Sequence, residues 1–176
     1  ELMNLFREVA DIKTADQLML PTPEVMYHNE VSQPTEIQKK LVQELSERAT
    51  KVHARMVDPS EDNMLAITND GRKLGLDQRV VNPLLPDADG TKVNRCVDNV
   101  FRIWQEGADK KLTQLVFCDL STPGKGFNIY DDIKTKLISR GVPESEIAFI
   151  HTADTDMKKK ELFAKVRSGN VRVLLG

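Results

Sequence analysis

A chain of 176 residues is long enough for one domain with a sizeable core, or for one domain with an appended segment, but too short for two full α/β domains. Lys and Arg together number 25 against 27 Asp and Glu, and the net charge of -2 excludes a global basic field that would attract nucleic acid. Any contact with nucleic acid must therefore be local.

Cysteine usage and hydropathy bear on where the protein works. Cys96 and Cys118 fall in an expected helix and an expected buried strand, which favours two reduced thiols and a cytoplasmic protein. No apolar run approaches membrane-spanning length, and charged residues interrupt the apolar start of the chain. We therefore expect no membrane partner and no signal peptide.

The front of the chain has the pattern of helices and linkers. Apolar residues from Leu2 to Val9 have helical spacing, the Pro-containing stretch 11–23 predicts a connector, and the weak alternation over 25–31 predicts an edge strand. Pro34, Thr35 and Glu36 then open a strong amphipathic helix that can extend towards Met56.

The stretch 58–62 breaks this helix, and Asp58 or Ser60 is expected to cap the next one. Within 64–81 the sequence Asn69-Asp70-Gly71 is a turn signal, so we expect two helical pieces joined by a turn. Three cations lie close to that turn: Arg72, Lys73 and Arg79. They form either a solvated cationic face or a contact with phosphate, and both interpretations stay open.

A loop is expected over 82–90, followed by an amphipathic helix from Val93 to Trp104 that ends near Gly107. Short apolar strands then alternate with helices. Strands are expected at 113–119, 147–150 and 171–175, and helices at 127–140 and 155–168, with Asp154 or Asp156 as the cap of the second helix. This order is typical of an α/β fold with a parallel sheet and right-handed crossovers.

Ligands of open parallel sheets collect beyond the carboxyl ends of the strands. The loops 120–126 and 151–154 are therefore the expected site, together with whatever follows Gly176. Because the chain stops at the end of an apolar strand, we expect an excised piece whose α/β unit is truncated at its C-terminal end.

Familiar catalytic motifs are missing from the sequence. Gly124-Lys125-Gly126 lacks the spacing of a phosphate loop, and there is no Gly-x-Ser-x-Gly, His-Glu-x-x-His or Cys-x-x-Cys. Ser121 and Thr122 lie just beyond the first strand with Lys125 nearby. Their hydroxyls either bind a phosphate oxygen or satisfy the backbone of a turn, and both possibilities stay open.

Three runs in the second half have a recognisable order: Q-L-V-F-C-D-L-S-T-P from Gln114, Y-D-D-I-K-T-K-L-I-S-R-G-V-P-E-S-E-I-A-F-I-H-T-A-D-T from Tyr130, and K-K-K-E-L-F-A-K-V-R-S-G-N-V-R-V-L-L-G from Lys158. Together they resemble the second RecA-like domain of superfamily 2 helicases. More narrowly, they are similar to SNF-type helicases of bacterial mobile elements and phages, often large proteins with a DNA methylase region. The run P-E-V-M-Y-H-N-E-V-S-Q-P-T-E-I-Q-K-K-L from Pro23 is similar to the segment that joins the two RecA-like domains in SNF-type enzymes.

The resemblance implies a RecA-like parallel sheet with flanking helices, preceded by a helical linker region. Residues 1–33 would be the interdomain linker and edge strand, 34–108 the helical region, and 109–176 a partial helicase core. Ser121 and Thr122 match the family's fourth motif region, whose loop touches the nucleic-acid backbone, and His151 matches a loop that approaches the same DNA strand. Lys125 is a further contact candidate, and Arg72 and Lys73 are weaker ones.

In this family ATP and Mg²⁺ bind between two RecA-like domains. The first domain supplies the phosphate loop and the acidic motif, and the second supplies an arginine finger after the fifth motif. The chain contains none of these groups, so we expect no catalytic residue, no bound cofactor and no ATP hydrolysis by it alone. The expected partners are the DNA backbone, bound without regard to sequence, and the first RecA-like domain of the parent.

Two rival hypotheses remain. The first is a non-catalytic α/β module that binds a protein partner through an acidic surface, which the net charge of -2 favours slightly. The second is a small nucleotide-binding enzyme, which the missing phosphate-cradling glycine loop disfavours.

Overall fold

The computed structural model describes residues 9–10, 13–19, 21–22 and 24–176. The helices are α2 (Ala15–Leu18), α3 (Glu36–His53), α4 (Met64–Leu76), α5 (Gln78–Val81), α6 (Lys92–Glu106), α7 (Ile129–Ser139) and α8 (Asp156–Arg167). The strands are β1 (Gln114–Val116), β2 (Ile147–Phe149) and β3 (Val173–Leu175), and two 3-10 turns, η1 (Glu144–Glu146) and η2 (Ile150–Thr152), flank β2. None of the described helices is long and apolar enough to cross a membrane.

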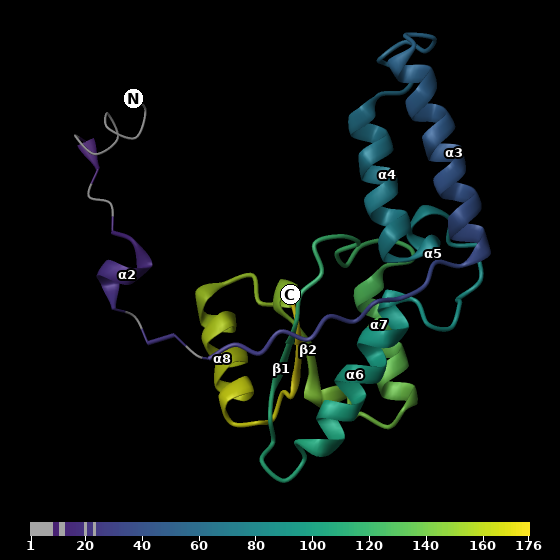
Figure 1. Cartoon of the computed structure of the whole chain (residues 1–176). Coiled ribbons are helices and arrows are strands. Elements are labelled where there is room, and N and C mark those ends of the chain that lie inside the picture. Colours follow the sequence, from purple (N-terminus) through teal and green to yellow (C-terminus); the bar gives the residue numbers. More distant parts are fainter. Residues whose placement is uncertain (1–8, 11–12, 20, 23) are drawn as a thin grey trace.

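The three strands form one parallel sheet in the order β1-β3-β2. Leu174 of β3 lies between Leu115 of β1 and Ala148 of β2 in the register. The central strand β3 is buried along its whole length. Figure 1 shows α8 on one side of the sheet and α6 and α7 on the other. The expected α/β class and parallel pairing are confirmed.

The core lies between the sheet and the α6–α7 pair. Val93, Val97 and Val100 recur at steps of four and three, which places them on one face of α6, and all three are buried. Thr91 caps α6 by accepting a hydrogen bond from the Asn94 amide at 3.2 Å. In the same way, the Asn128 side chain caps α7. The caps satisfy helix-end amides that would otherwise lack partners.

Helices α3 and α4 form an antiparallel hairpin that stands away from the sheet (Figure 1). The sequence predicts the start of α3 correctly, because Thr35 and Gln38 form a capping box. The Gln38 amide donates to the Thr35 hydroxyl at 3.0 Å, and the Thr35 amide donates to the Gln38 side chain at 2.9 Å. None of residues 36–53 is buried, so the hairpin has little hydrophobic core of its own.

The prediction of a turn at Asn69-Asp70-Gly71 is wrong, because α4 includes all three residues. Arg48 of α3 donates to Asp70 at 2.9 Å and to both carboxylate oxygens of Asp62 at 2.8 and 2.9 Å. Gly71 faces α3 closely enough that an added Cβ would lie 3.9 Å from Leu45 Cδ1. Contacts with α3 therefore override the local turn preference.

Two helix caps also differ from expectation. Helix α3 ends at His53, and Asn63 caps α4 by accepting from the Ala66 amide at 3.0 Å, whereas Asp58 binds the amide and hydroxyl of Ser60. Thr155, rather than an aspartate, caps α8 by accepting from the Lys158 amide at 3.3 Å. Asn63 lies three residues after Ser60, and Thr155 lies between Asp154 and Asp156; both have the extended backbone that a cap requires.

The front of the chain differs more. The stretch 25–31 carries no strand, since nothing in the described residues pairs with it, and the connector contains the short helix α2. The helix expected from Leu2 falls outside the described residues, apart from its end at Val9.

The strand expected at 113–119 is shorter and less buried than predicted. Within the described residues β1 pairs on one edge only, with β3. Successive side chains of a strand point to opposite faces of the sheet, so Val116 is buried in the core whereas Leu115, on the other face, is 58% exposed. Phe117, just beyond the strand, is 77% exposed. The apolar run alone does not show that one side of this strand lacks a covering element.

Candidate nucleic-acid interface

The carboxyl ends of the strands meet at one edge of the sheet, where the loop 117–128 and η2 leave β1 and β2. Tyr130 of α7 holds this edge together, because its buried hydroxyl lies 2.7 Å from the Cys118 carbonyl and 3.0 Å from the Gly176 carbonyl. The Cys118 amide also donates to Gly176 at 3.1 Å. Burial raises the pKa of Tyr130, so its proton stays in place at neutral pH.

Ser121 is held by the backbone that follows it. Its oxygen accepts from the Ile129 amide at 3.1 Å, and its φ of 60° lies in the left-handed region. This is the local bonding that a turn requires, although a hydroxyl bonded in this way still has one hydrogen to donate. Thr122 and Lys125 are exposed, and no side-chain hydrogen bond or ion pair holds either of them within the described residues.

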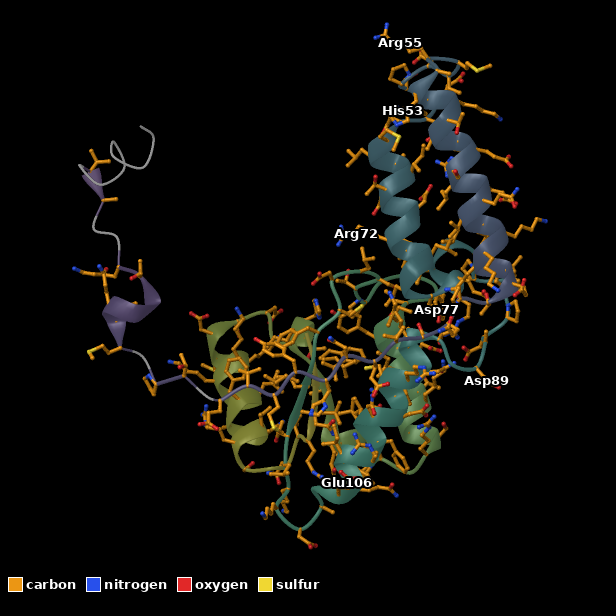
Figure 2. All side chains as sticks on the ribbon, viewed as in Figure 1. His53, Arg55, Arg72, Asp77, Asp89 and Glu106 are labelled. Atoms are coloured by element: carbon orange, nitrogen blue, oxygen red, sulfur yellow. The ribbon has the colours of Figure 1, made fainter. Side chains whose placement is uncertain are left out.

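A cleft of about 800 Å³ lies beside this loop. Its lining residues come from α4, from the first turn of α6 and from the end of β1 with the loop after it: Thr68, Gly71, Arg72, Gly75, Leu76, Lys92, Phe117, Cys118, Asp119 and Leu120. Figure 2 shows Arg72 projecting from α4 on the side where this loop lies. The fold thus brings together residues that are about 50 positions apart in the sequence.

Two cations line the cleft from different elements. Among the residues that the structure describes, neither Arg72 nor Lys92 forms an ion pair or a side-chain hydrogen bond. Asp119 contributes a carboxylate to the same lining. Two unpaired cations beside a polar loop can bind an anionic ligand such as a phosphate group.

Lys73 does not line the cleft. It follows Arg72 by one residue, which on a helix is a rotation of about 100°, and its ammonium lies 3.9 Å from Asp70. Arg72 and Lys73 are adjacent in the sequence and were predicted to act together, whereas in the structure Arg72 shares the cleft with Lys92. Lys92 was missed because its only local signal is its position after the cap Thr91.

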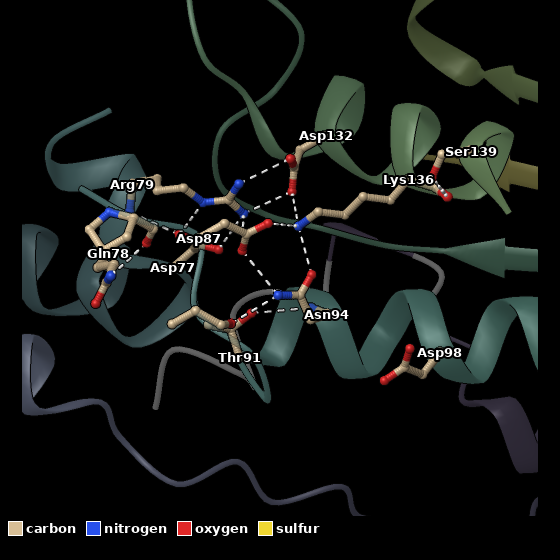
Figure 3. A network of polar contacts seen from close by, with 12 residues as sticks. Asp77, Gln78, Arg79, Asp87, Thr91, Asn94, Asp98, Asp132, Lys136 and Ser139 are labelled. Carbon is tan, nitrogen blue, oxygen red and sulfur yellow. Dashed lines mark hydrogen bonds and ion pairs between the residues drawn. The ribbon is translucent and has the colours of Figure 1, made fainter. Parts of the chain in front are cut away.

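Arg79, the third cation of the expected cluster, is buried in an ion network shown in Figure 3. Its guanidinium lies 2.8 Å from Asp77, 2.9 Å from Asp132 and 3.3 Å from Asp87. Burial disfavours its charge, but the hydrogen bonds to Asp77 and Asp132 outweigh burial and hold the pKa of Arg79 above its usual range. Arg79 is therefore a structural cation that is not available to a ligand.

Lys136 of α7 continues this network, with its ammonium 2.7 Å from Asp87 and 2.8 Å from Asp132. Asn94 of α6 donates to Asp87 at 3.0 Å. Burial disfavours the Asp87 carboxylate, but the bonds from Lys136 and Asn94 outweigh burial and lower its pKa. The network joins α5, the loop 82–90, α6 and α7, and so fixes the base of the hairpin relative to the sheet.

His151 lies at the same edge of the sheet but outside the lining of the cleft. Its ring stands edge-on to Tyr130, with 5.2 Å between the ring centroids, and the residue is exposed. The structure thus separates the six sequence candidates. Arg72 lines the cleft. The loop continues from the lining residue Leu120 into Ser121, Thr122 and Lys125. Lys73 and His151 do not line the cleft.

In the described part of the chain, no three His, Cys, Asp or Glu side chains gather as a group that could hold a metal ion.

Comparisons with models of protein families, with characterised proteins and with known structures found no match to this chain.

Proposed function

We propose that this chain is part of an ATP-dependent DNA helicase or translocase and contacts the DNA backbone. The proposal takes the α/β unit as part of a RecA-like lobe. It is supported by the resemblance of the runs from Gln114, Tyr130 and Lys158 to SNF-type helicases of mobile elements, and by the parallel sheet that these runs form.

The observation that carries the proposal is the cleft at the carboxyl edge of the sheet. Arg72 and Lys92 line it without ion-pair partners in the described residues, and its wall continues into the loop of Ser121, Thr122 and Lys125. Lys and Arg contacts to phosphate supply most of the affinity of sequence-independent DNA binding. A local cationic site of this kind is compatible with the overall charge of -2.

In the parent, this lobe would pair with a first RecA-like lobe that carries the ATP and Mg²⁺ ligands, and the protein would act in the cytoplasm. Closure of the two lobes on ATP and their reopening after hydrolysis would advance the grip on the DNA. No residue of this chain is assigned a catalytic role, and we expect the chain alone not to hydrolyse ATP.

The test is DNA binding by this chain, measured by fluorescence anisotropy over a series of salt concentrations. The variant Arg72→Ala with Lys92→Ala removes both cleft cations. The variant Lys51→Ala with Arg55→Ala removes the same charge elsewhere, because Lys51 lies in the last turn of α3 and Figure 2 shows Arg55 at the far tip of the hairpin. We expect the cleft variant to weaken binding and to reduce the salt slope by about one per lost phosphate contact. The tip variant should bind almost normally.

Either of two results would reject the proposal. One is a folded chain that binds no DNA at low salt. The other is an equal loss in both variants, which would show that only total charge matters. Ser121→Ala with Thr122→Ala then tests the loop, and DNA stimulation of ATP hydrolysis by the full-length parent tests the motor.

A second candidate is a protein-interaction module without enzymatic activity. The exposed Leu115 and Phe117 favour it, because large apolar side chains in water often mark a contact with another protein. This candidate would replace the first if DNA had no effect on ATP hydrolysis by a folded parent.

A further inference from the structure

The most exposed aromatic ring of the sheet region lies in the wall of the cleft. Phe117 follows β1 directly, is 77% exposed and lines the cleft together with Arg72 and Lys92. Its ring edge lies near the end of β3, since Cε1 would lie 3.9 Å from a Cβ built on Gly176. An aromatic face that is open to water can take a second flat ring against it.

The α4 wall of the cleft leaves room for such a ring. Thr68, Gly71 and Gly75 lie on one side of α4, and a Cβ added to Gly75 would meet nothing within 4 Å. The cleft volume of about 800 Å³ is in the range of sites that hold small organic ligands. The cleft therefore offers an aromatic surface, an open helix wall and two cations in one space.

A nucleotide of a single strand has the matching chemistry. Its base has a flat face that can stack on Phe117, and its flanking phosphates are the anions that Arg72 and Lys92 can bind. A base inside a duplex has both faces covered by its neighbours and can reach a side chain in this way only after it is flipped out.

We propose that the cleft binds single-stranded DNA with one unpaired base stacked on Phe117 and the adjacent phosphates at Arg72 and Lys92. The inference rests on the proposed function and extends it by naming an unpaired strand as the ligand. It also assigns a role to Phe117 that differs from the backbone contacts of Ser121 and Thr122.

The experiment compares binding of oligothymidylate and of a duplex of equal length by this chain and by two variants of Phe117. Phe117→Leu keeps an apolar side chain but removes the aromatic face, and Phe117→Trp keeps an aromatic face. We expect Phe117→Leu to weaken single-strand binding about tenfold and Phe117→Trp to preserve it, in line with the range for base stacking. Duplex binding through the phosphates should stay within about twofold in all three proteins.

A matched control is Leu84→Ala, which removes an apolar side chain that is 92% exposed and lies outside the cleft lining. A single strand carrying 2-aminopurine provides a second readout. Stacking should quench its fluorescence on the original chain and on Phe117→Trp, but not on Phe117→Leu. Thermal melts check that each variant is folded. We expect both Phe117 variants to fold, because the side chain is exposed.

The possible outcomes separate the two proposals. If Phe117→Leu binds single strands as well as the original chain, or loses single-strand and duplex binding equally, the stacking inference is wrong and the backbone contacts stand. If neither DNA binds the original chain, the proposed function fails and the inference fails with it.

Discussion

The hairpin of α3 and α4 and the unit formed by the sheet with α6 and α7 are held by different forces. None of residues 36–53 of α3 is buried, and α4 buries Ile67 and Leu74. The main buried cluster instead joins α6, α7 and the three strands, and only Leu76 at the end of α4 packs against it. The hairpin depends more on polar contacts, above all those of Arg48 with Asp62 and Asp70.

This difference shows that amphipathic spacing predicts whether a segment is helical, but not how strongly the helix is held in the fold. All four helices have an apolar stripe, but only α6 and α7 have a sheet to cover. Regions with few buried apolar contacts open at lower free energy than the core. We therefore expect the hairpin to open before the sheet unit unfolds, with the Arg79 network as the boundary between them.

The largest expected loss of stability comes from removing Arg79, and the matched change in the hairpin is the removal of Arg48. Arg79→Met would leave the fully buried Asp77 without its cationic partner, and loss of one member of a buried ion pair costs about 3 to 5 kcal/mol of unfolding free energy. Arg48→Met breaks a partly exposed pair in the hairpin and should cost about 1 kcal/mol or less. Urea unfolding of both variants measures the difference, and equal losses would contradict the proposed contrast.

The core substitution Leu137→Ala comes next. Leu137 is fully buried in α7, and truncation at such a site costs about 2 to 5 kcal/mol. The matched change Leu45→Ala removes a half-buried side chain of α3 and should cost clearly less. Thermal unfolding followed by circular dichroism compares the two. If Leu45→Ala were the more damaging change, the hairpin would contribute more to stability than its burial indicates.

Features set by neighbouring residues could be predicted from the sequence. The start of α3 follows from Thr35 and Gln38, which are three residues apart, and the alternation of strands and helices after residue 109 follows from local apolar spacing. These features give the α/β class and the order of its elements. They also place Ser121, Thr122 and Lys125 in the loop after β1.

Features set by distant residues could not be predicted. Asp70 lies within a helix and is bound by Arg48, 22 positions earlier. The buried charge of Arg79 is balanced by its neighbour Asp77 and also by Asp132, 53 positions later. Likewise, only the folded chain shows that Lys92 shares a cleft with Arg72. The exposure of Phe117 depends on which face of the sheet is covered by helices at β1, which the apolar run of a single strand does not encode.

Acid should act on the boundary between the two regions. Because the pKa of Asp87 is lowered in the folded protein from its usual 3.8, the unfolded state binds this proton more readily. The stabilisation by Asp87 is therefore present above about pH 4 and is lost as the pH falls through the folded pKa. The free energy of unfolding, measured at a series of acid pH values, should fall less steeply with decreasing pH for Asp87→Asn than for the original chain.

Lys136→Gln serves as the reciprocal control, because it removes the cation that holds Asp87 ionised. It should also flatten the acid decline while leaving the carboxylate in place. An unchanged decline in both variants would show that the network does not set the acid stability of the boundary.

The smallest effect is a gain in the hairpin. Gly75 lies inside α4 and an added Cβ would meet nothing within 4 Å, so Gly75→Ala should raise the unfolding free energy by about 1 kcal/mol. Gly90 also has open space around it, but its φ of +75° disfavours any other residue, and Gly90→Ala should lower the unfolding free energy by about 1 kcal/mol. Neither site has a steric conflict, so changes of opposite sign in the unfolding free energy, measured with urea, would identify backbone conformation as the cause. A loss at Gly75 would instead show that the helix is strained where it lines the cleft.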